Sequence, residues 1–185
     1  TPQGNSSFAN IDFEIINRSA NPVVVNGTTY AVGDAVMTIT TDENGHASTG
    51  NDALPYGTYE VRESATNESM LLTWTGETVQ VRQNDHSVAI TAVNDVERGG
   101  LSVEKQDTIT GSTPQGDANF QGITFEIINN SRNPVMVEGQ KYQPGEVVKT
   151  LVTDSEGKAS TADDLLPYGE YILHESATNE SMLLT

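Results

Sequence analysis

The chain has 185 residues, with 9 lysines and arginines against 26 acidic residues and a formal net charge of −17. This balance argues against nucleic-acid binding, because a phosphate-binding surface needs clustered lysine and arginine. No cysteine is present, which excludes disulfides and thiolate metal sites, and no apolar run approaches the roughly 18 residues of a membrane-spanning helix. The length suits two small domains or one of ordinary size. No signal peptide opens the sequence, so we expect a piece of a longer, mature protein.

One internal repeat organises the sequence. TPQGNSSFANIDFEIIN, which starts at residue 1, returns as TPQGDANFQGITFEIIN at residue 113, and the offset of 112 residues holds without a gap to residue 185. Of the 73 positions that overlap, 44 are identical, whereas residues 74–112 occur once. The chain therefore contains less than two copies of a 112-residue unit.

The predicted elements are short strands, taken here in chain order. IDFEIIN and ITFEIIN alternate apolar and polar residues. NPVVV and NPVMV follow as β-branched runs, each leading into a turn at Asn26-Gly27 or Glu138-Gly139. TTDENGHAST and VTDSEGKAST are typical of strand–turn–strand. LPYGTYEVRES and LPYGEYILHES place a Pro-Tyr-Gly turn before an alternating strand, and QNDHSVAITAVND is one more alternating segment. This pattern favours an all-β sandwich, and no stretch predicts a long amphipathic helix.

A further alternating strand, GGLSVEKQD at residues 99–107, precedes the second copy. A repeat that begins near Gly99 divides the chain in two. Residues 1–98 are then a first repeat without its opening strand, and residues 99–185 are a second repeat without its closing strand.

Polar side chains occur on the apolar faces of these strands. Period-2 spacing places Glu63, and its counterpart Glu175, on the same face as the apolar residues before them. The same spacing places Asn94 at the end of one apolar face and Lys105 at the end of another. Each apolar face therefore carries one carboxyl, carboxamide or amine group.

Such groups can react with one another when they are buried together. Burial lowers the pKa of lysine and raises that of glutamate, so the two can exchange a proton and become neutral. A neutral amine is a nucleophile, and a protonated glutamate can polarise an asparagine carbonyl. Attack on that carbon with loss of ammonia forms a Lys–Asn isopeptide bond, favoured because the fold holds the groups in contact. The alternative is that each residue caps a strand end, with Lys105 reaching solvent and Asn94 starting a turn.

The chain resembles the collagen-adhesin B-type domains, also called SpaA-like pilin domains, of Gram-positive surface proteins. The resemblance rests on LSVEKQD, FEIIN, the TDENGHAST and TDSEGKAST hairpins, the LPYG-Y-x-x-x-E element and VAITAVND. It implies a small β-sandwich of reversed immunoglobulin, prealbumin-like type. It also implies a bond between a lysine of the first strand and an asparagine of the last. Carried over, Lys105 is the amine, Asn94 the acceptor amide, and Glu63 and Glu175 the promoting acids.

The chain departs from this pattern because no copy holds all three residue types in order. All four lysines lie after residue 104, so the first copy has Glu63 and Asn94 but no lysine. The second copy has Lys105 and Glu175 but lacks the asparagine strand. Closure between Lys105 and Asn94 within one chain is not expected, because only residues 95–100 join their strands. Exchange of strands between two chains is feasible.

Other sites are weakly indicated. Asp42, Glu43 and Asn44 resemble half of a calcium loop, but the spacing and terminal glutamate of an EF-hand are absent, which favours a β-turn. His46, His86 and His174 fall at non-equivalent positions of the repeat, which argues against a zinc site. We expect no cofactor and no metal.

We therefore expect a stalk repeat of an extracellular, cell-wall-attached adhesin or pilus-like protein, with internal Lys–Asn bonds in complete repeats. Its expected partners are adjacent repeats, a second copy through strand exchange, and a host ligand at a distal domain, with no nucleic acid and no membrane. The alternative is that the repeats themselves bind a host protein or glycan, although aromatic residues make up only 6% of the chain. A conventional enzyme is the least favoured class, since no turnover site can be assembled.

Overall fold

The computed structural model describes residues 1–84 and 87–184, so His86 and the last residue of the expected second repeat lie outside the described residues. The regular secondary structure within these ranges consists of strands. The all-β prediction is therefore confirmed. No helix that could cross a membrane occurs among the described residues.

The chain forms two compact units. The first unit is Ser7–Asp95, and the second unit is Thr1–Ser6 together with Val96–Thr185. This division differs from the expected repeat boundaries at both ends of the first unit. Residues 96–98 belong to the second unit because Arg98 pairs with Pro167 and the amide of Tyr168 donates to the carbonyl of Glu97 at 2.7 Å. Residues 1–6 belong to it through contacts described below.

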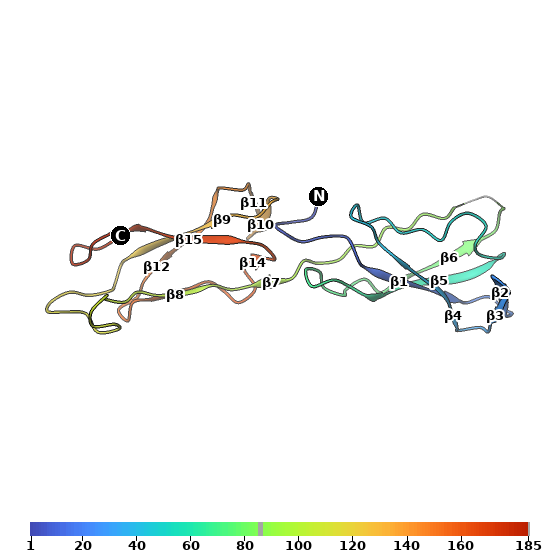
Figure 1. The fold of residues 1–185 in the computed structure, drawn as a ribbon, viewed down its shortest axis with the longest axis horizontal. Coiled ribbons are helices and arrows are strands. Elements are labelled where there is room, and N and C mark those ends of the chain that lie inside the picture. The colour runs from blue at the N-terminus through green and yellow to red at the C-terminus, as the bar shows by residue number, and fades with distance from the viewer. Residues whose placement is uncertain (85–86, 185) are drawn as a thin grey trace. The chain divides into compact units, whose positions relative to one another are not determined.

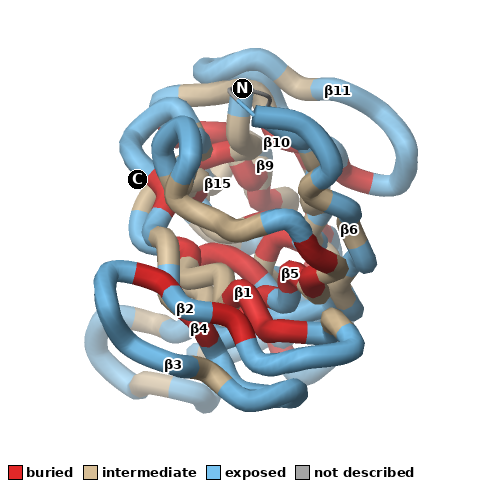
Figure 2. The backbone as a smooth tube through the Cα atoms, turned by 90° about the vertical axis from the view of Figure 1, so that its right-hand side faces the viewer, coloured by how far each residue is buried: buried red, intermediate tan, exposed pale blue. Residues whose placement is uncertain are grey.

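The first unit is built on a four-stranded antiparallel sheet in the order β4-β1-β5-β6. These strands are β1 (Asp12–Asn17), β4 (Ala35–Thr40), β5 (Gly57–Ala65) and β6 (Glu77–Val81). A hairpin of β2 (Val23–Val25) and β3 (Thr28–Tyr30) turns at Asn26 and Gly27, whose φ values of 49° and 79° suit the left-handed turn that joins two strands. Figure 2 shows the buried residues along β1 and β5. The buried core consists of Ile15, Val23, Val25, Val36, Tyr59 and Val61.

The second unit repeats this plan with an added strand segment. Its main sheet has the order β12-β9-β15, made of β12 (Val147–Val152), β9 (Thr124–Asn129) and β15 (Tyr171–Ala177) (Figure 1). β10 (Val135–Val137) pairs with β11 (Gln140–Tyr142). β8 (Ser102–Glu104) pairs with β13 (Lys158–Ser160), and β7 (Arg98–Gly99) pairs with β14 (Leu166–Pro167). Leu101 and Val103 pack against the buried core of Ile123, Phe125, Ile127, Val135, Val137, Val148, Leu151 and Leu166.

Some strand predictions fail in the first unit, and the reason is a missing partner. Residues 46–48 and 54–55, the counterparts of β13 and β14, are not strands, because no opening strand lies beside them to complete a ladder. The closing segment 87–94 was predicted as a strand and is irregular. Its alternation nevertheless persists, since Ile90, Ala92 and Asn94 are half-buried between exposed neighbours. The strand β6 was not predicted.

Residues 1–6 form a turn, called here the N-terminal turn, that packs within the second unit. The amide of Gly4 donates to the carbonyl of Pro134 and the amide of Asn5 to the carbonyl of Tyr168, each at 3.1 Å. The amide of Asn133 donates back to the carbonyl of Gly4 at 3.1 Å. Gly4 has a φ of 55°, and a Cβ there would lie 2.3 Å from the carbonyl oxygen of Tyr168. Only glycine fits this position.

Replacing Gly4 by alanine is expected to release the N-terminal turn, because the new methyl group cannot share space with the Tyr168 carbonyl. Hydrogen exchange of the Asn5 and Asn133 amides is expected to accelerate at least about tenfold. The matched control is Gly116→Ala, which has a similar φ of 57° but meets nothing within 4 Å. Equal exchange in the two variants would show that strain, and not lost docking, is the cause.

Candidate cross-linking site

Glu63 occupies the core side of β5. It lies opposite Phe13 of β1 in the sheet register and is 4% exposed. Its Oε1 accepts a hydrogen bond from Nδ2 of Asn94 at 2.5 Å. Its other oxygen, Oε2, is buried and has no hydrogen-bond partner. The structure thus brings together Glu63 and Asn94, two of the polar side chains that alternation placed on apolar faces.

The pKa of Glu63 is raised above its ordinary value. The main cause is removal of the carboxyl group from water, and the hydrogen bond from Asn94 opposes the shift by favouring the ionised form. A carboxyl group of this kind binds a proton more readily than one in water. That property suits a group whose role is to hold a proton against a carbonyl oxygen.

Lys105 meets the corresponding glutamate of the second unit. Its Nζ lies 2.8 Å from Oε2 of Glu175, and the two side chains are 14% and 11% exposed. Glu175 Oε1 is buried without a hydrogen-bond partner. The backbone amide of Lys105 donates to the carbonyl of Gly157 at 2.8 Å, which anchors the end of the opening strand beside the β12–β13 turn. Lys105 therefore lies inside the unit and pairs with Glu175.

The two pairs are complementary halves of one arrangement. Glu63 and Glu175 are equivalent residues of the repeat, and each binds a different one of the two expected partners. Each also keeps one buried oxygen unbound. Burial of an unpaired carboxyl oxygen is unfavourable, so Oε2 of Glu63 and Oε1 of Glu175 are each available to a further hydrogen-bond donor. Lys105 and Asn94 lie in different units, so neither unit contains all three groups.

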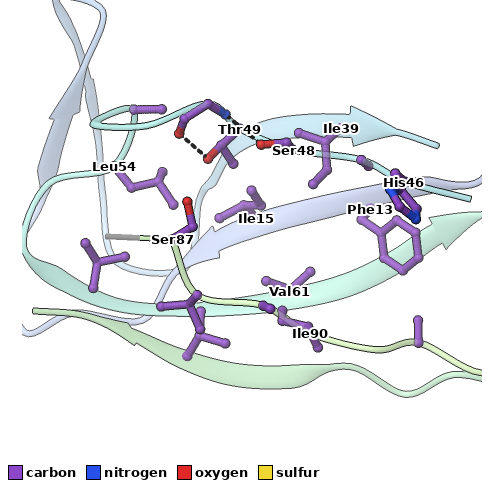
Figure 3. A pocket seen from close by; sticks show the side chains of 18 of the residues that line it. Phe13, Ile15, Ile39, His46, Ser48, Thr49, Leu54, Val61, Ser87 and Ile90 are labelled. Carbon is purple, nitrogen blue, oxygen red and sulfur yellow. Dashed lines mark hydrogen bonds between the residues drawn. The ribbon is translucent and has the colours of Figure 1, made fainter. Parts of the chain in front are cut away.

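A groove runs along the first unit where an opening strand is missing. It has a volume of about 1550 Å³ and is lined by apolar side chains from β1, β4, β5 and the closing segment. Figure 3 shows Phe13, Ile15, Ile39, Val61 and Ile90 around it, with His46, Ser48, Thr49 and Leu54 from the segment that has no strand partner.

In the second unit, the equivalent edge is covered by β7 and β8. Ala159 pairs with Val103, and Leu166 pairs with Gly99. The counterparts of Ala159 and Leu166, which are Ala47 and Leu54, line the groove of the first unit. The groove therefore corresponds to the position of the opening strand that carries the lysine.

No group of metal-ligating side chains is found among the described residues. Asp42 instead closes a turn, since its Oδ1 accepts hydrogen bonds from the amides of Asn44 and His46 at 2.9 and 3.0 Å. These bonds lower the pKa of Asp42. The β-turn predicted at TDENG is confirmed.

Two features were not anticipated from the sequence. The buried asparagines Asn17 and Asn129 donate to the carbonyls of Asn21 and Asn133, which fixes the entry to each hairpin. The identical TPQG segments are the second feature, because the first of them is a docking element. The sequence signalled the TPQG segments only through their identity in the two copies, and this identity could not indicate which residues they contact.

Replacing Glu63 by glutamine is expected to change the pH dependence of folding. The pKa of Glu63 is raised in the folded state. Its contribution to the free energy of unfolding is therefore fully present below its pKa in the unfolded chain, about 4.5, and is lost as the pH rises through its pKa in the folded protein. The free energy of unfolding of the wild type should therefore fall, relative to Glu63→Gln, as the pH is raised above that value. Urea denaturation of both proteins across this range measures the difference. A parallel pair of curves would contradict the assignment.

Replacing Lys105 by methionine is expected to destabilise the second unit by about 2 kcal/mol, because it leaves Glu175 without its partner inside the protein. The matched control is Lys149→Met, which breaks the more exposed pair with Glu138 and is expected to cost under about 1 kcal/mol. Urea denaturation compares the two. Equal losses of unfolding free energy in the two variants would mean that burial does not strengthen the pair of Lys105 and Glu175.

The comparisons with known proteins agree with this architecture. The model of the SpaA family, described as a prealbumin-like fold domain, matches residues 2–96. Among solved structures, the Bacillus anthracis TIE protein is similar at 22% identity and a TM-score of 0.52, over 95% of this chain and 27% of that one. A streptococcal ancillary pilin is similar at 22% identity and a TM-score of 0.36, over 93% of this chain and 50% of that one.

The chain thus spans about a quarter of the first of these structures and half of the second. At this identity, the TIE protein supports the fold alone. The comparison with curated proteins gives no match. The family model covers more than half of the chain, and the all-strand architecture agrees with it, so the chain belongs to the SpaA family of prealbumin-like fold domains.

Proposed function

We propose that this chain is part of the stalk of an extracellular, cell-wall-attached adhesin or pilus-like protein of a Gram-positive bacterium, whose complete repeats close through a Lys–Asn isopeptide bond. The observation that carries the proposal is the pair of complementary half-sites. Glu63 binds Asn94 and Glu175 binds Lys105, and each glutamate retains one unbound buried oxygen. Membership of a family that includes pilin domains supports the surface location.

The reaction follows from the groups that the two halves supply. A proton passes from the lysine ammonium to the glutamate, which leaves a neutral amine and a carboxylic acid. The amine nitrogen attacks the carboxamide carbon of asparagine while the acid donates its hydrogen bond to the carbonyl oxygen. The new C–N bond forms as the bond from the carbonyl carbon to the amide nitrogen breaks, and the leaving –NH2 group takes one proton from the attacking amine and departs as ammonia.

In the first unit, the carboxamide of Asn94 donates to Glu63 through Nδ2. The reaction requires the opposite orientation, with Oδ1 facing a protonated Glu63. A half-turn of the carboxamide provides it, because the amide carries its oxygen and nitrogen symmetrically about the terminal carbon. The raised pKa of Glu63 favours the protonated form that this orientation needs.

The consequence of such a bond is mechanical. It ties the first strand of a repeat to the last, so that the chain between them cannot be extended by pulling, much as a disulfide constrains a chain. Repeats in tandem give length through local contacts. The protein would then act as a spacer that holds a distal ligand-binding domain away from the cell wall. The chain is not proposed to be an enzyme, because each bond forms once.

A complete first repeat is expected to form the bond by itself. It is made by adding residues 97–112 ahead of Thr1, which places a copy of the lysine strand before the first unit. Intact mass under denaturing conditions is expected to show the loss of one ammonia. Lysine→Ala at the added copy of Lys105, or Glu63→Ala, is expected to restore the full mass. A folded extended chain that keeps its full mass would contradict the proposal.

The unextended chain is expected to remain a monomer of unchanged mass, because β8 is already paired in its own unit. Strand exchange between two chains would instead join Lys105 of one to Asn94 of the other. A boiling-resistant dimer that lacks ammonia and disappears in Lys105→Ala would identify that route. Saturable binding of a host protein or glycan by the isolated repeats would favour the alternative function, a ligand-binding module.

A further inference from the structure

The N-terminal turn has a second copy in the chain, at residues 113–118. Both begin with TPQG, and both adopt the same conformation. Gly4 and Gly116 have φ values of 55° and 57°. In each copy the amide two residues after the glycine donates to the carbonyl of the glutamine, at 2.9 Å from Ser6 and 3.0 Å from Ala118. We call residues 113–118 the second turn.

The two turns differ in what surrounds them. Gly4 is buried, and a Cβ there would strike the Tyr168 carbonyl. Gly116 is exposed, and a Cβ there would meet nothing within 4 Å. The second turn therefore keeps the docking conformation without a docking partner at its glycine, through the bond from Ala118 and through Asp107, whose carboxylate accepts from Gln115 Nε2 at 2.9 and 3.0 Å. Its aspartate, Asp117, supplies a side-chain acceptor oxygen at the position where Asn5 accepts from the amide of Arg132.

The surface that receives the N-terminal turn also has a second copy. It consists of residues 132–136 and Tyr168 in the second unit, and the counterparts in the first unit are residues 20–24 and Tyr56, which we call the vacant acceptor. Asn133, Pro134 and Tyr168 are identical to their counterparts Asn21, Pro22 and Tyr56. Most of the hydrogen bonds to the N-terminal turn come from backbone groups, so they do not depend on the residues that differ.

The local structure around residues 20–24 is the same as that around residues 132–136. Asn17 Nδ2 donates to the carbonyl of Asn21 at 3.1 Å, as Asn129 Nδ2 does to that of Asn133 at 3.2 Å. Val23 pairs with Tyr30 as Val135 pairs with Tyr142. The two surfaces differ in solvent exposure, and the residues of the vacant acceptor are the more exposed, as expected for a surface without a partner.

Val24 is 57% exposed, whereas its counterpart Met136 is 37% exposed beneath the N-terminal turn. Tyr56 is 73% exposed, whereas Tyr168 is half-buried. The vacant acceptor thus shares the hairpin of the occupied one and is more exposed, whereas residues 54–55 before Tyr56 are not a strand as β14 is, and Arg82 lies 4.6 Å from the centre of the Tyr56 ring.

We propose that the second turn of one copy of this chain binds the vacant acceptor of a second copy, so that copies associate head to tail. The two surfaces are different and lie on different units, so the contact is heterologous and leaves one turn and one acceptor free at the ends of each assembly. The contact is small, well below a standard interface, so it is weak between separate chains. It becomes effective when repeats are linked in tandem, because linkage raises their effective concentration. This inference does not depend on the isopeptide bond.

The test follows amide NMR signals of the full chain as the protein concentration is raised to the solubility limit. The amides of residues 20–24 and 113–118 are expected to shift together, with a rise in average mass by sedimentation. Gly116→Ala is expected to weaken association at least about tenfold, because the equivalent methyl group at Gly4 would strike a carbonyl. The matched control is Gly122→Ala, which has a φ of 79° and equally open space outside the turn. It is expected to associate like the wild type.

The acceptor is tested by Asn21→Asp, which is close in shape but replaces the amide donor that, at Asn133, donates to the carbonyl of Gly4 at 3.1 Å. Each variant alone is expected to remain monomeric. A mixture of Gly116→Ala and Asn21→Asp is expected to form dimers, because the first retains its acceptor and the second retains its turn.

The proposal is overturned if the wild type shows no concentration-dependent shifts at these residues. It is equally overturned if Gly116→Ala associates like Gly122→Ala, or if the mixture stays monomeric while the wild type associates.

Discussion

The candidate site is built on one buried carboxyl group in each unit. Each of these glutamates has two carboxyl oxygens, and only one of the two accepts a hydrogen bond. Glu63 contacts an amide and Glu175 contacts an amine, although the two residues are equivalent. A buried carboxyl oxygen without a partner is costly, and each unit has one. The groove of the first unit and the cover of β7 and β8 on the second both depend on whether an opening strand is present.

The two copies also show what a strand needs in order to form. The segments around Ala47 and Ala159 are nearly identical, yet only the second is a strand, because β8 supplies its ladder partner. Alternation along the sequence correctly predicted that Glu63, Asn94 and Lys105 lie on the inward side of their segments, but Val88, predicted to share a face with Asn94, is 42% exposed. It could not predict that residues 87–94 remain irregular, because hydrogen bonding between strands depends on a neighbour and not on the pattern of the segment itself.

The predicted family and fold class followed from motifs that are local, such as the turn at Asn26-Gly27 and the strand after Pro-Tyr-Gly. The pairing of Lys105 with Glu175 is a long-range contact across 70 positions, and their assignment to one site came from the family resemblance, because alternation alone indicates which way a side chain faces and not which side chain it meets. The placement of the N-terminal turn was not predicted, because three of its hydrogen bonds join backbone groups, which every residue type carries. The steric requirement at Gly4 and the side-chain bonds of Gln3, Asn5 and Asn133 tie that contact to the sequence.

The position of the N-terminal turn also sets an order of events during synthesis. Gln3 and Asn5 are synthesised well before their partners Met136 and Arg132, which lie 133 and 127 positions later. The residues of the first unit, which end at Asp95, are all synthesised before those partners exist. That unit must therefore fold with its leading segment unattached, because domains fold as units from the N-terminal end of a growing chain. Attachment of the turn is then a late step, which closes a loop around a unit that is already folded.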